Sequence, residues 1–281
     1  MRSPLVTPAD RPDALQELFG VRKPIIGTIH LPPLPGAPRY TGEPVRAIYA
    51  RAVEDARRYA EGGVDGLIVE NEGDTPFLKP DEIGPETAAC MAVATSAVID
   101  AVGLPTGVLV LANATLHSIA VAKAAGAQFV RANQWVNAYI ANEGYLEGTA
   151  ARALRYRAQL QAPGLRIFAD VHVKHGSHAI VADRTIAELT HDAEAFDADV
   201  VIATGQRTGD PTRVEEITAI SSVAQRPVLV GSGLDAENAR ELLEHAHGAI
   251  VGSAMKEYGV WWNPVSVANT RKIMDAVKEL R

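Results

Sequence analysis

Eight short apolar runs recur along the chain, and they restrict its fold more than any other feature. Each run is rich in Val and Ile and apolar on both faces, which is typical of a strand buried in a parallel sheet. Between the runs lie stretches with apolar residues at helical spacing, such as Val45–Glu61 and Ala150–Leu160. The eight runs are Ile25–His30, Gly66–Asn71, Thr106–Leu111, Phe129–Asn133, Arg166–Val173, Val200–Gly205, Pro227–Gly233 and Ala249–Ala254.

Eight strands alternating with helices predict an α/β fold, a single (β/α)8 TIM barrel with parallel strands. Such a barrel takes about 250 residues, so we expect one domain over residues 1–281, with 1–20 as an N-terminal extension. An open doubly wound sheet is the competing interpretation. That fold normally has a Gly-rich turn after its first strand, whereas here the first run is followed by Leu31-Pro32-Pro33-Leu34-Pro35-Gly36.

Composition narrows the class of protein. The formal net charge of −7 argues against a nucleic-acid-binding surface. The single cysteine, Cys90, leaves no internal disulfide and no cysteine cluster for a metal, and we interpret it as a small buried hydrophobe. No apolar run approaches the roughly 20 residues of a membrane span, and Met1–Gly20 lacks the pattern of a secretory signal. We therefore expect a cytoplasmic homo-oligomer without a transmembrane segment, which leaves peripheral membrane attachment open.

Glycines close the last two predicted strands and predict a phosphate site. Loops at this place in the fold often hold a phosphate, because glycines let backbone N–H groups approach the anion. A helix predicted to begin near Asp235 would add positive partial charge, and Lys256 would add a full one. The alternative is that the glycines only serve tight turns. The expected phosphate-binding residues are Gly205, Gly231, Ser232, Gly233, Gly252 and Ser253.

The fifth run continues into a lysine, and its alternation places three ionisable side chains on one face. Asp170, His172 and Lys174 alternate with Val171 and Val173, which we expect to pack outward under helices. Three ionisable groups inside a barrel are costly unless they pair or take part in function. We interpret them as an acid–base site. A structural ion-pair ladder, a metal-assisted site and a Schiff base formed by the lysine are the alternatives.

Polar residues at other strand ends predict the lining of the same cleft. The expected catalytic residues are Asp170, His172, Lys174, Glu70 and His30, and the expected substrate-binding residues are Asn71, Asn113, Arg131, Asn133 and Thr204. Residues i and i+4 lie about 13 Å apart along a strand, so Glu70 and Arg131 are the expected partners of Asp170 and Lys174. Glu70, Asp170 and His172 could together bind a divalent metal. No H-E-x-x-H spacing supports one, so we predict no metal site and no obligatory cofactor.

Three long insertions follow the first, second and fourth runs, at the mouth where active sites of this fold are built. They are Leu31–Pro44, Glu72–Gly84 and Gln134–Gly148. Prolines restrict the backbone of the first insertion. We therefore expect Leu31–Arg39 to be ordered and to wall one side of the mouth, with Arg39 available to an anion.

Six segments, which together cover nearly the whole chain, carry a resemblance to the BtpA family. The proline-rich opening and the strand-five motif are specific, whereas many phosphate-binding barrels share the glycine motifs. The matching segments are Gly27–Gly36, Gly63–Asn71 with Gly73–Phe77, Ala169–His175, Ala203–Gly205 with Thr208 and Gly209, Val230–Gly233, and Gly248–Ser253. The chain departs from the family pattern at Ala112-Asn113-Ala114, where the family has Arg-Asn-Asp, and at Asn142-Glu143, where it has Asp-Gln.

The resemblance implies a TIM barrel and a pocket rather than one reaction. The founding members of the family are described as photosystem I biogenesis proteins, and SgcQ-like members of sugar-utilisation clusters are labelled nucleosidases. We expect an enzyme that acts on a small phosphorylated sugar or nucleoside-like metabolite, with lyase, isomerase or N-glycosidase chemistry. Asp170 or Glu70 would be the acid or base, His172 its proton partner, and Lys174 would stabilise negative charge. The alternative is an assembly or regulatory factor that only binds a phosphorylated ligand, which the missing charges beside Asn113 favour.

Overall fold

The computed structural model describes residues 11–205 and 212–281. Within them eight parallel strands close into a barrel in the order β1-β11-β10-β9-β7-β4-β3-β2, which confirms the predicted TIM barrel. The barrel strands are β1 (Ile25–His30), β2 (Gly66–Glu70), β3 (Thr106–Leu109), β4 (Phe129–Ala132), β7 (Arg166–Asp170), β9 (Val200–Ala203), β10 (Val228–Val230) and β11 (Ala249–Val251). Thr208 and Gly209, which contribute to the family resemblance, lie outside the described residues.

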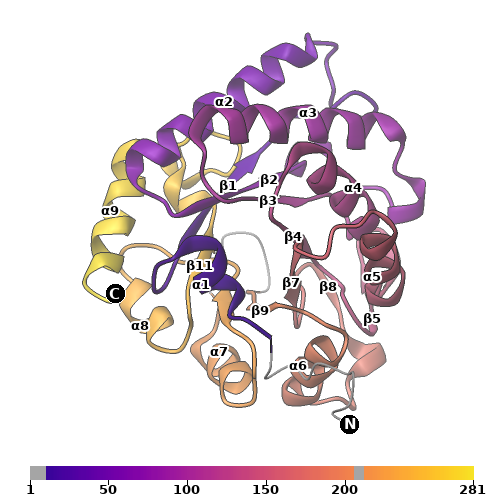
Figure 1. Ribbon diagram of the computed structural model, residues 1–281, viewed down its shortest axis with the longest axis vertical. Helices are drawn as coiled ribbons and strands as arrows, with labels where there is room; N and C mark the ends of the chain where they lie inside the picture. Colours follow the sequence, from indigo (N-terminus) through magenta and orange to yellow (C-terminus); the bar gives the residue numbers. More distant parts are fainter. Residues whose placement is uncertain (1–10, 206–211) are drawn as a thin grey trace.

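Helices surround the barrel in chain order from α2 to α9, as Figure 1 shows. None of the helices in the described residues is both long and apolar enough to cross a membrane. The helices are α1 (Ala14–Phe19), α2 (Val45–Gly62), α3 (Pro85–Val102), α4 (Thr115–Ala125), α5 (Ala150–Gln159), α6 (Ile186–Ala195), α7 (Val214–Ser221), α8 (Ala239–Glu244) and α9 (Val267–Lys278).

Alternation along the strands divides the core into two parts. Outward side chains such as Leu67 and Ile167 pack with the helices in the larger cluster. Inward side chains such as Ile68, Phe129 and Phe168 fill the barrel itself. The rings of Phe129 and Phe168 stack with their centroids 4.4 Å apart. Because side chains repeat every second residue along a strand, the positions two residues further along these three strands also face the barrel axis, and they are Glu70, Arg131 and Asp170.

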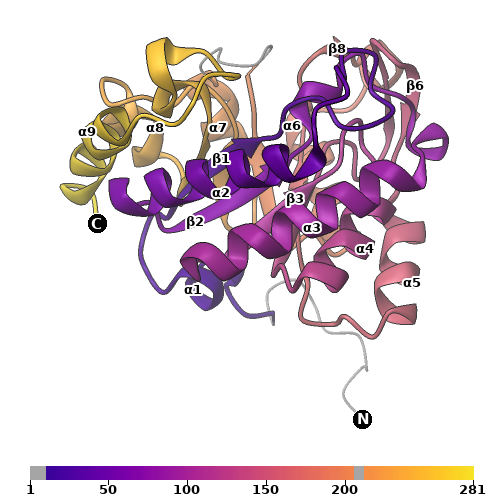
Figure 2. The same cartoon turned by 90° about the horizontal axis from the view of Figure 1, so that it is seen from above.

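The short helix α1 closes the end of the barrel opposite the cavity described below. The Asp13 carboxylate caps it by accepting hydrogen bonds from the backbone N–H groups of Leu15 and Gln16, at 2.9 and 3.1 Å. Ala14 and Leu15 join the inner cluster of the barrel. Figure 2 shows α1 at one end of the molecule and strands β6 and β8 at the other. Helix α1 and the small sheet therefore lie at opposite ends of the barrel.

The insertion Gln134–Gly148 contains a β-hairpin. Its strands β5 (Ala138–Ala141) and β6 (Gly144–Glu147) pair antiparallel, and β8 (Gly176–Ser177) joins them in a three-stranded sheet of order β6-β5-β8. This small sheet brings the loop after β7 next to the loop after β4. It therefore fixes one wall of the barrel mouth.

Strand β7 is shorter than predicted, and this changes the interpretation of its polar residues. The strand ends at Asp170 rather than at Val173, so period-two alternation no longer decides where the next side chains lie. Val171 packs in the outer cluster as expected. Val173 instead packs with Tyr139 of the hairpin and lines the cavity. The expected single face of Asp170, His172 and Lys174 is therefore wrong.

Candidate active site

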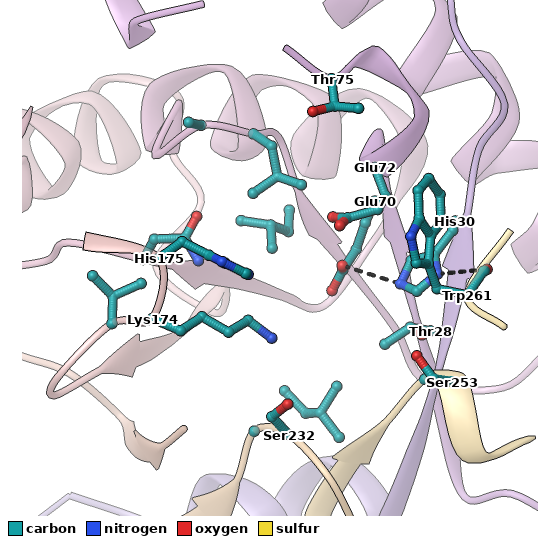
Figure 3. A pocket seen from close by; sticks show the side chains of 18 of the residues that line it. Thr28, His30, Glu70, Glu72, Thr75, Lys174, His175, Ser232, Ser253 and Trp261 are labelled. Carbon is teal, nitrogen blue, oxygen red and sulfur yellow. Dashed lines mark hydrogen bonds and ion pairs between the residues drawn. The ribbon is translucent and has the colours of Figure 1, made fainter. Parts of the chain in front are cut away.

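A cavity of about 760 Å³ opens at the carboxyl ends of the barrel strands. Small-molecule sites commonly span about 300–1,000 Å³, so this cavity has room for a metabolite. Its polar lining comes from β1, β2 and β4, from the β5–β6 hairpin, and from the loops after β2, β7, β10 and β11. Figure 3 shows Lys174 on one side of it, Glu70 and His30 on another, and Ser232 and Ser253 on a third.

His30 and Glu70 form a pair inside the cavity. His30 Nε2 lies 3.6 Å from Glu70 Oε2, and His30 Nδ1 lies 3.1 Å from the carbonyl oxygen of Trp261. Because a carbonyl oxygen only accepts hydrogen bonds, Nδ1 carries a hydrogen. Nε2 faces the Glu70 carboxylate across a distance longer than a hydrogen bond. The pair is therefore placed to exchange a proton with a ligand in the cavity.

The two carboxyls of this region, Glu70 and Glu72, have pKa values displaced in opposite directions. Burial alone would raise the pKa of Glu70, but the hydrogen bond and charge of His30, with the charges of Arg131 and Lys174, hold it below its ordinary value. Burial raises the pKa of Glu72 above its ordinary value, against the charge of His30. Titratable groups with diverging pKa values are typical of acid and base roles. Glu70 suits the base and Glu72 the acid.

Lys174 extends into the cavity from the loop after β7 (Figure 3). Within the described chain its amine makes no hydrogen bond and has no carboxylate at ion-pair distance. Burial and the charge of Arg131 lower the pKa of this amine, and the carboxylates of Glu72, Asp170 and Glu70 offset that shift only in part. The cavity therefore contains an amine with reduced preference for its charged form.

Asp170 lies behind the cavity wall and holds Arg131. Arg131 Nε and Nη2 donate to the two carboxylate oxygens at 3.0 and 3.1 Å, and Asn133 Nδ2 donates to Oδ2 at 3.3 Å. The expected partnership with Arg131 is confirmed, and Arg131 also lies 4.0 Å from Glu70. Asp170 does not line the cavity. The catalytic assignment of Asp170 stays a prediction, and its geometry suits a positioning residue.

His172 lies apart from the cavity in a stack of rings. Its imidazole packs on His178 with centroids 3.9 Å apart, and His178 packs on Tyr139 at 5.2 Å. Burial, His178 and Arg213 lower the pKa of His172 to about 4. It does not line the cavity, so it is poorly placed to be a proton partner there. Across residues 11–205 and 212–281 no three His, Cys, Asp or Glu side chains could hold a metal ion, and the trio Glu70, Asp170 and His172 is accordingly not assembled.

The predicted substrate-binding residues divide into two groups. Arg131 and Asn133 line the cavity, whereas Asn71, Asn113 and Thr204 do not. Asn71 accepts a hydrogen bond from Leu111 N at 2.7 Å and donates to Asp74 at 2.9 Å. Asn113 accepts from Gln134 N at 2.9 Å and donates to the Glu147 carbonyl at 3.3 Å. Both asparagines therefore fix loops.

Five of the six predicted phosphate-binding residues line the cavity, and Gly205 does not. The backbone N–H groups of Gly233 and Ser253 donate to no acceptor in the described chain. The expected helix near Asp235 is wrong, because α8 begins only at Ala239. Asp235 instead accepts hydrogen bonds within a turn. Any anion here would be held by loop N–H groups rather than by the start of α8.

Lys256 does not reach the cavity, which corrects the expectation that it assists a phosphate. Its side chain is 1% exposed and pairs with Asp55 at 3.3 Å. Its amine lies 5.2 Å from the centroid of the Tyr59 ring. Asp55 also accepts a hydrogen bond from Val265 N at 2.9 Å. The pair ties the segment after β11 to α2.

Lys256→Met is expected to lower the free energy of unfolding by about 3 kcal/mol, the lower end of the cost of breaking a buried ion pair. Asp55 would lose its cation but keep the hydrogen bond from Val265. Urea unfolding of the variant and the parent measures this difference. Affinity for ribose 5-phosphate, measured well below the melting temperature, should stay unchanged. Loss of affinity without loss of stability would restore Lys256 to the ligand site.

The proline-rich segment is ordered as expected, but it does not present Arg39 to the cavity. Leu34 N donates to the Asp74 carboxylate at 2.7 Å and anchors the segment to the loop after β2. Arg39 is exposed and lies outside the lining. Conversely, Glu72 and Trp261 line the cavity and were not predicted. Glu72 lies in a 3-10 turn after β2, where strand alternation does not apply.

Fold and cavity together define a TIM-barrel protein with a carboxylate, an imidazole and an amine at its mouth. Residues 21–279 match the BtpA family, and the chain belongs to that family. It is 36% identical over 246 residues to the photosystem I biogenesis protein BtpA of Synechocystis, covering 87% of this chain and 84% of that protein. It is 40% identical over 258 residues to an uncharacterized protein of Archaeoglobus fulgidus, covering 92% and 100%. The fold resembles tryptophan synthase from Mycobacterium tuberculosis, with a TM-score of 0.60 at 19% identity, covering 95% of this chain and 99% of that one.

Proposed function

We propose that this protein is an enzyme acting on a small phosphorylated sugar or nucleoside-like metabolite by general acid–base chemistry. One observation carries the proposal. The Glu70–His30 pair and the amine of Lys174 face the same cavity as the glycine loops after β10 and β11. A phosphate held by the loops would bring the carbon skeleton of the ligand to the ionisable groups.

Each group has a role that follows from its surroundings. Glu70, whose pKa is lowered despite burial, takes a proton from the substrate, and His30 shares that proton. Glu72, whose pKa burial raises, returns a proton. Lys174 stabilises negative charge that develops on the substrate oxygen or carbon. Lyase, isomerase and N-glycosidase reactions all use such a set.

The phosphate assignment rests on hydrogen-bond donors without acceptors. The half-buried backbone N–H groups of Gly233 and Ser253 face the cavity side of their loops and donate to no acceptor in the described chain. Backbone N–H groups at glycine-rich turns form anion-binding concavities. Any side chain at position 252 would put its Cβ 2.8 Å from the Thr28 hydroxyl oxygen, so the glycine keeps this corner of the cavity open.

A screen of phosphorylated compounds tests the proposal. Thermal shift with ribose 5-phosphate, dihydroxyacetone phosphate and nucleoside 5′-monophosphates, each beside its dephosphorylated analogue, detects binding. Phosphorus and proton NMR of each hit then detects turnover. We expect stabilisation by phosphorylated compounds only, and conversion of at least one of them. Absence of any phosphate-dependent shift would exclude the proposed phosphate site.

Ser253→Asp is expected to weaken binding of a phosphorylated hit by about 5- to 1,000-fold, since like charges brought together at this range cost on the order of 1–4 kcal/mol. Ser253→Asn, of nearly the same shape without the charge, is the matched control and should bind far better than the aspartate variant. Isothermal titration calorimetry measures both. Equal affinity of the two variants would place the phosphate elsewhere.

The second candidate function is a non-catalytic assembly or regulatory factor that binds a phosphorylated ligand. Two observations favour it: the name of the Synechocystis relative, and the uncharged Ala112 and Ala114 beside Asn113. Binding in the screen without turnover of any hit would support this candidate over the enzyme.

We also propose that the protein is a homo-oligomer in the cytoplasm. Large apolar side chains are exposed on the hairpin and the neighbouring loop after β2, with Ile140 at 47%, Tyr145 at 46% and Leu78 at 52%. Contiguous exposed apolar surface commonly marks an interface. Sedimentation equilibrium measures the mass in solution, and a monomer at micromolar concentration would contradict the proposal.

A further inference from the structure

Lys174 is an unusual amine in this cavity. Its side chain is half-buried in the cavity lining, and its amine has no hydrogen bond and no ion pair in the described chain. The nearby carboxylates are engaged elsewhere, Asp170 with Arg131 and Glu70 with His30. Nothing in the described protein therefore fills the space in front of the amine, and Figure 3 shows it directed across the cavity.

The surroundings of the amine lower its pKa and so make its neutral form more accessible. Burial is the largest cause and the positive charge of Arg131 adds to it, whereas the carboxylates of Glu72, Asp170 and Glu70 act in the opposite direction. A neutral amine has the lone pair that an ammonium ion lacks. Lysines desolvated next to another cation are the ones that attack carbonyl carbons in enzymes.

We propose that Lys174 forms an imine with the carbonyl carbon of a phosphorylated aldehyde or ketone. This inference rests on the proposed function and specifies its substrate class. The substrate would carry its phosphate at the loops of Gly233 and Ser253 and present its carbonyl to the amine. The iminium ion then supplies, as a covalent group, the positive charge that stabilises a developing carbanion.

The groups that line the cavity can supply and accept every proton that imine formation requires. The nitrogen lone pair forms the C–N bond as the C=O π bond breaks, and the oxygen takes up the proton that the nitrogen gives up. The Glu72 carboxyl protonates that hydroxyl, water leaves, and the iminium forms beside the Glu72 carboxylate. Glu70 removes a proton from the carbon next to the iminium, which leaves a neutral enamine.

Reductive trapping tests the proposal directly. The full-length protein is incubated with dihydroxyacetone phosphate, glyceraldehyde 3-phosphate or ribose 5-phosphate in the presence of sodium cyanoborohydride. Intact mass should rise by the mass of one probe less one oxygen atom, and peptide mapping should place the adduct on Lys174. Glycerol 3-phosphate, which has no carbonyl, should bind without forming an adduct.

Variants separate specific trapping from surface labelling. Lys174→Met and Lys174→Arg should lose the adduct, whereas Lys123→Met, a change at an exposed lysine, should keep it. Circular dichroism melting checks that the variants fold, which we expect because removing an amine that has no hydrogen bond or ion pair in the described chain leaves no partner behind.

The outcomes distinguish this inference from the proposed function. Phosphate-dependent thermal shifts without any adduct on Lys174 would overturn the imine and leave the acid–base enzyme in place. An adduct spread over surface lysines, with none on Lys174, would overturn it equally. No shift with any phosphorylated probe would remove the proposed function itself.

Discussion

Glu70→Gln is expected to reduce turnover of the substrate found by the screen by about 10²–10⁴-fold, the usual contribution of a general base. Glutamine keeps the shape of the side chain but cannot take up a proton. The change should also lower stability somewhat at neutral pH, because the lowered pKa of Glu70 means that the folded protein favours its carboxylate. Initial rates and melting temperatures of the variant and the parent measure the two effects.

The pH profile supplies the control for this assignment. The base form of Glu70, with its lowered pKa, should be lost only in acid, and the acid form of Glu72, with its raised pKa, should be lost as the pH rises. kcat/KM should therefore be bell-shaped. Glu70→Gln should remove the acid limb from the residual activity, and Glu72→Gln the alkaline limb. Parent-like turnover in Glu70→Gln would assign the base to another residue.

The sequence predicted the barrel well because a parallel sheet covered by helices leaves a strong pattern. Each of the eight apolar runs contains one barrel strand, and β1 has the predicted bounds Ile25–His30. Errors lie at strand ends, where polar residues are compatible with either strand or loop. The run Arg166–Val173 was continued three residues too far for this reason.

The lining of the cavity was predictable where polar residues close a strand. His30, Glu70 and Arg131 were expected in the cleft because they lie at strand ends, and all three line the cavity. His172 was misplaced because β7 had already ended. Glu72 was missed because no local pattern shows which residue of a long insertion turns toward a cavity. Lys256 was misassigned because its partner Asp55 is distant in sequence, on α2.

Asp170→Asn is expected to lower the free energy of unfolding by about 3–5 kcal/mol, the cost of removing one member of a buried ion pair. The guanidinium of Arg131 is 4% exposed and would face a neutral amide. Both oxygens of Asp170 accept hydrogen bonds from Arg131, and Oδ2 also accepts one from Asn133. An asparagine offers one oxygen, so its NH₂ group would oppose another donor whichever way it turned.

A variant of this kind should also lose activity, but through Arg131 rather than through a lost acid or base. Arg131 is one of the charges that lower the pKa of Glu70. Its displacement should therefore move the acid limb of the kcat/KM profile to a different pH, and the profile should stay bell-shaped. Removal of a catalytic group would instead abolish one limb. A double-mutant cycle of Asp170→Asn with Arg131→Met, followed by urea unfolding, measures the coupling between the two side chains. Unchanged stability of Asp170→Asn together with loss of one limb would make Asp170 the acid or base and contradict its assignment as a positioning residue.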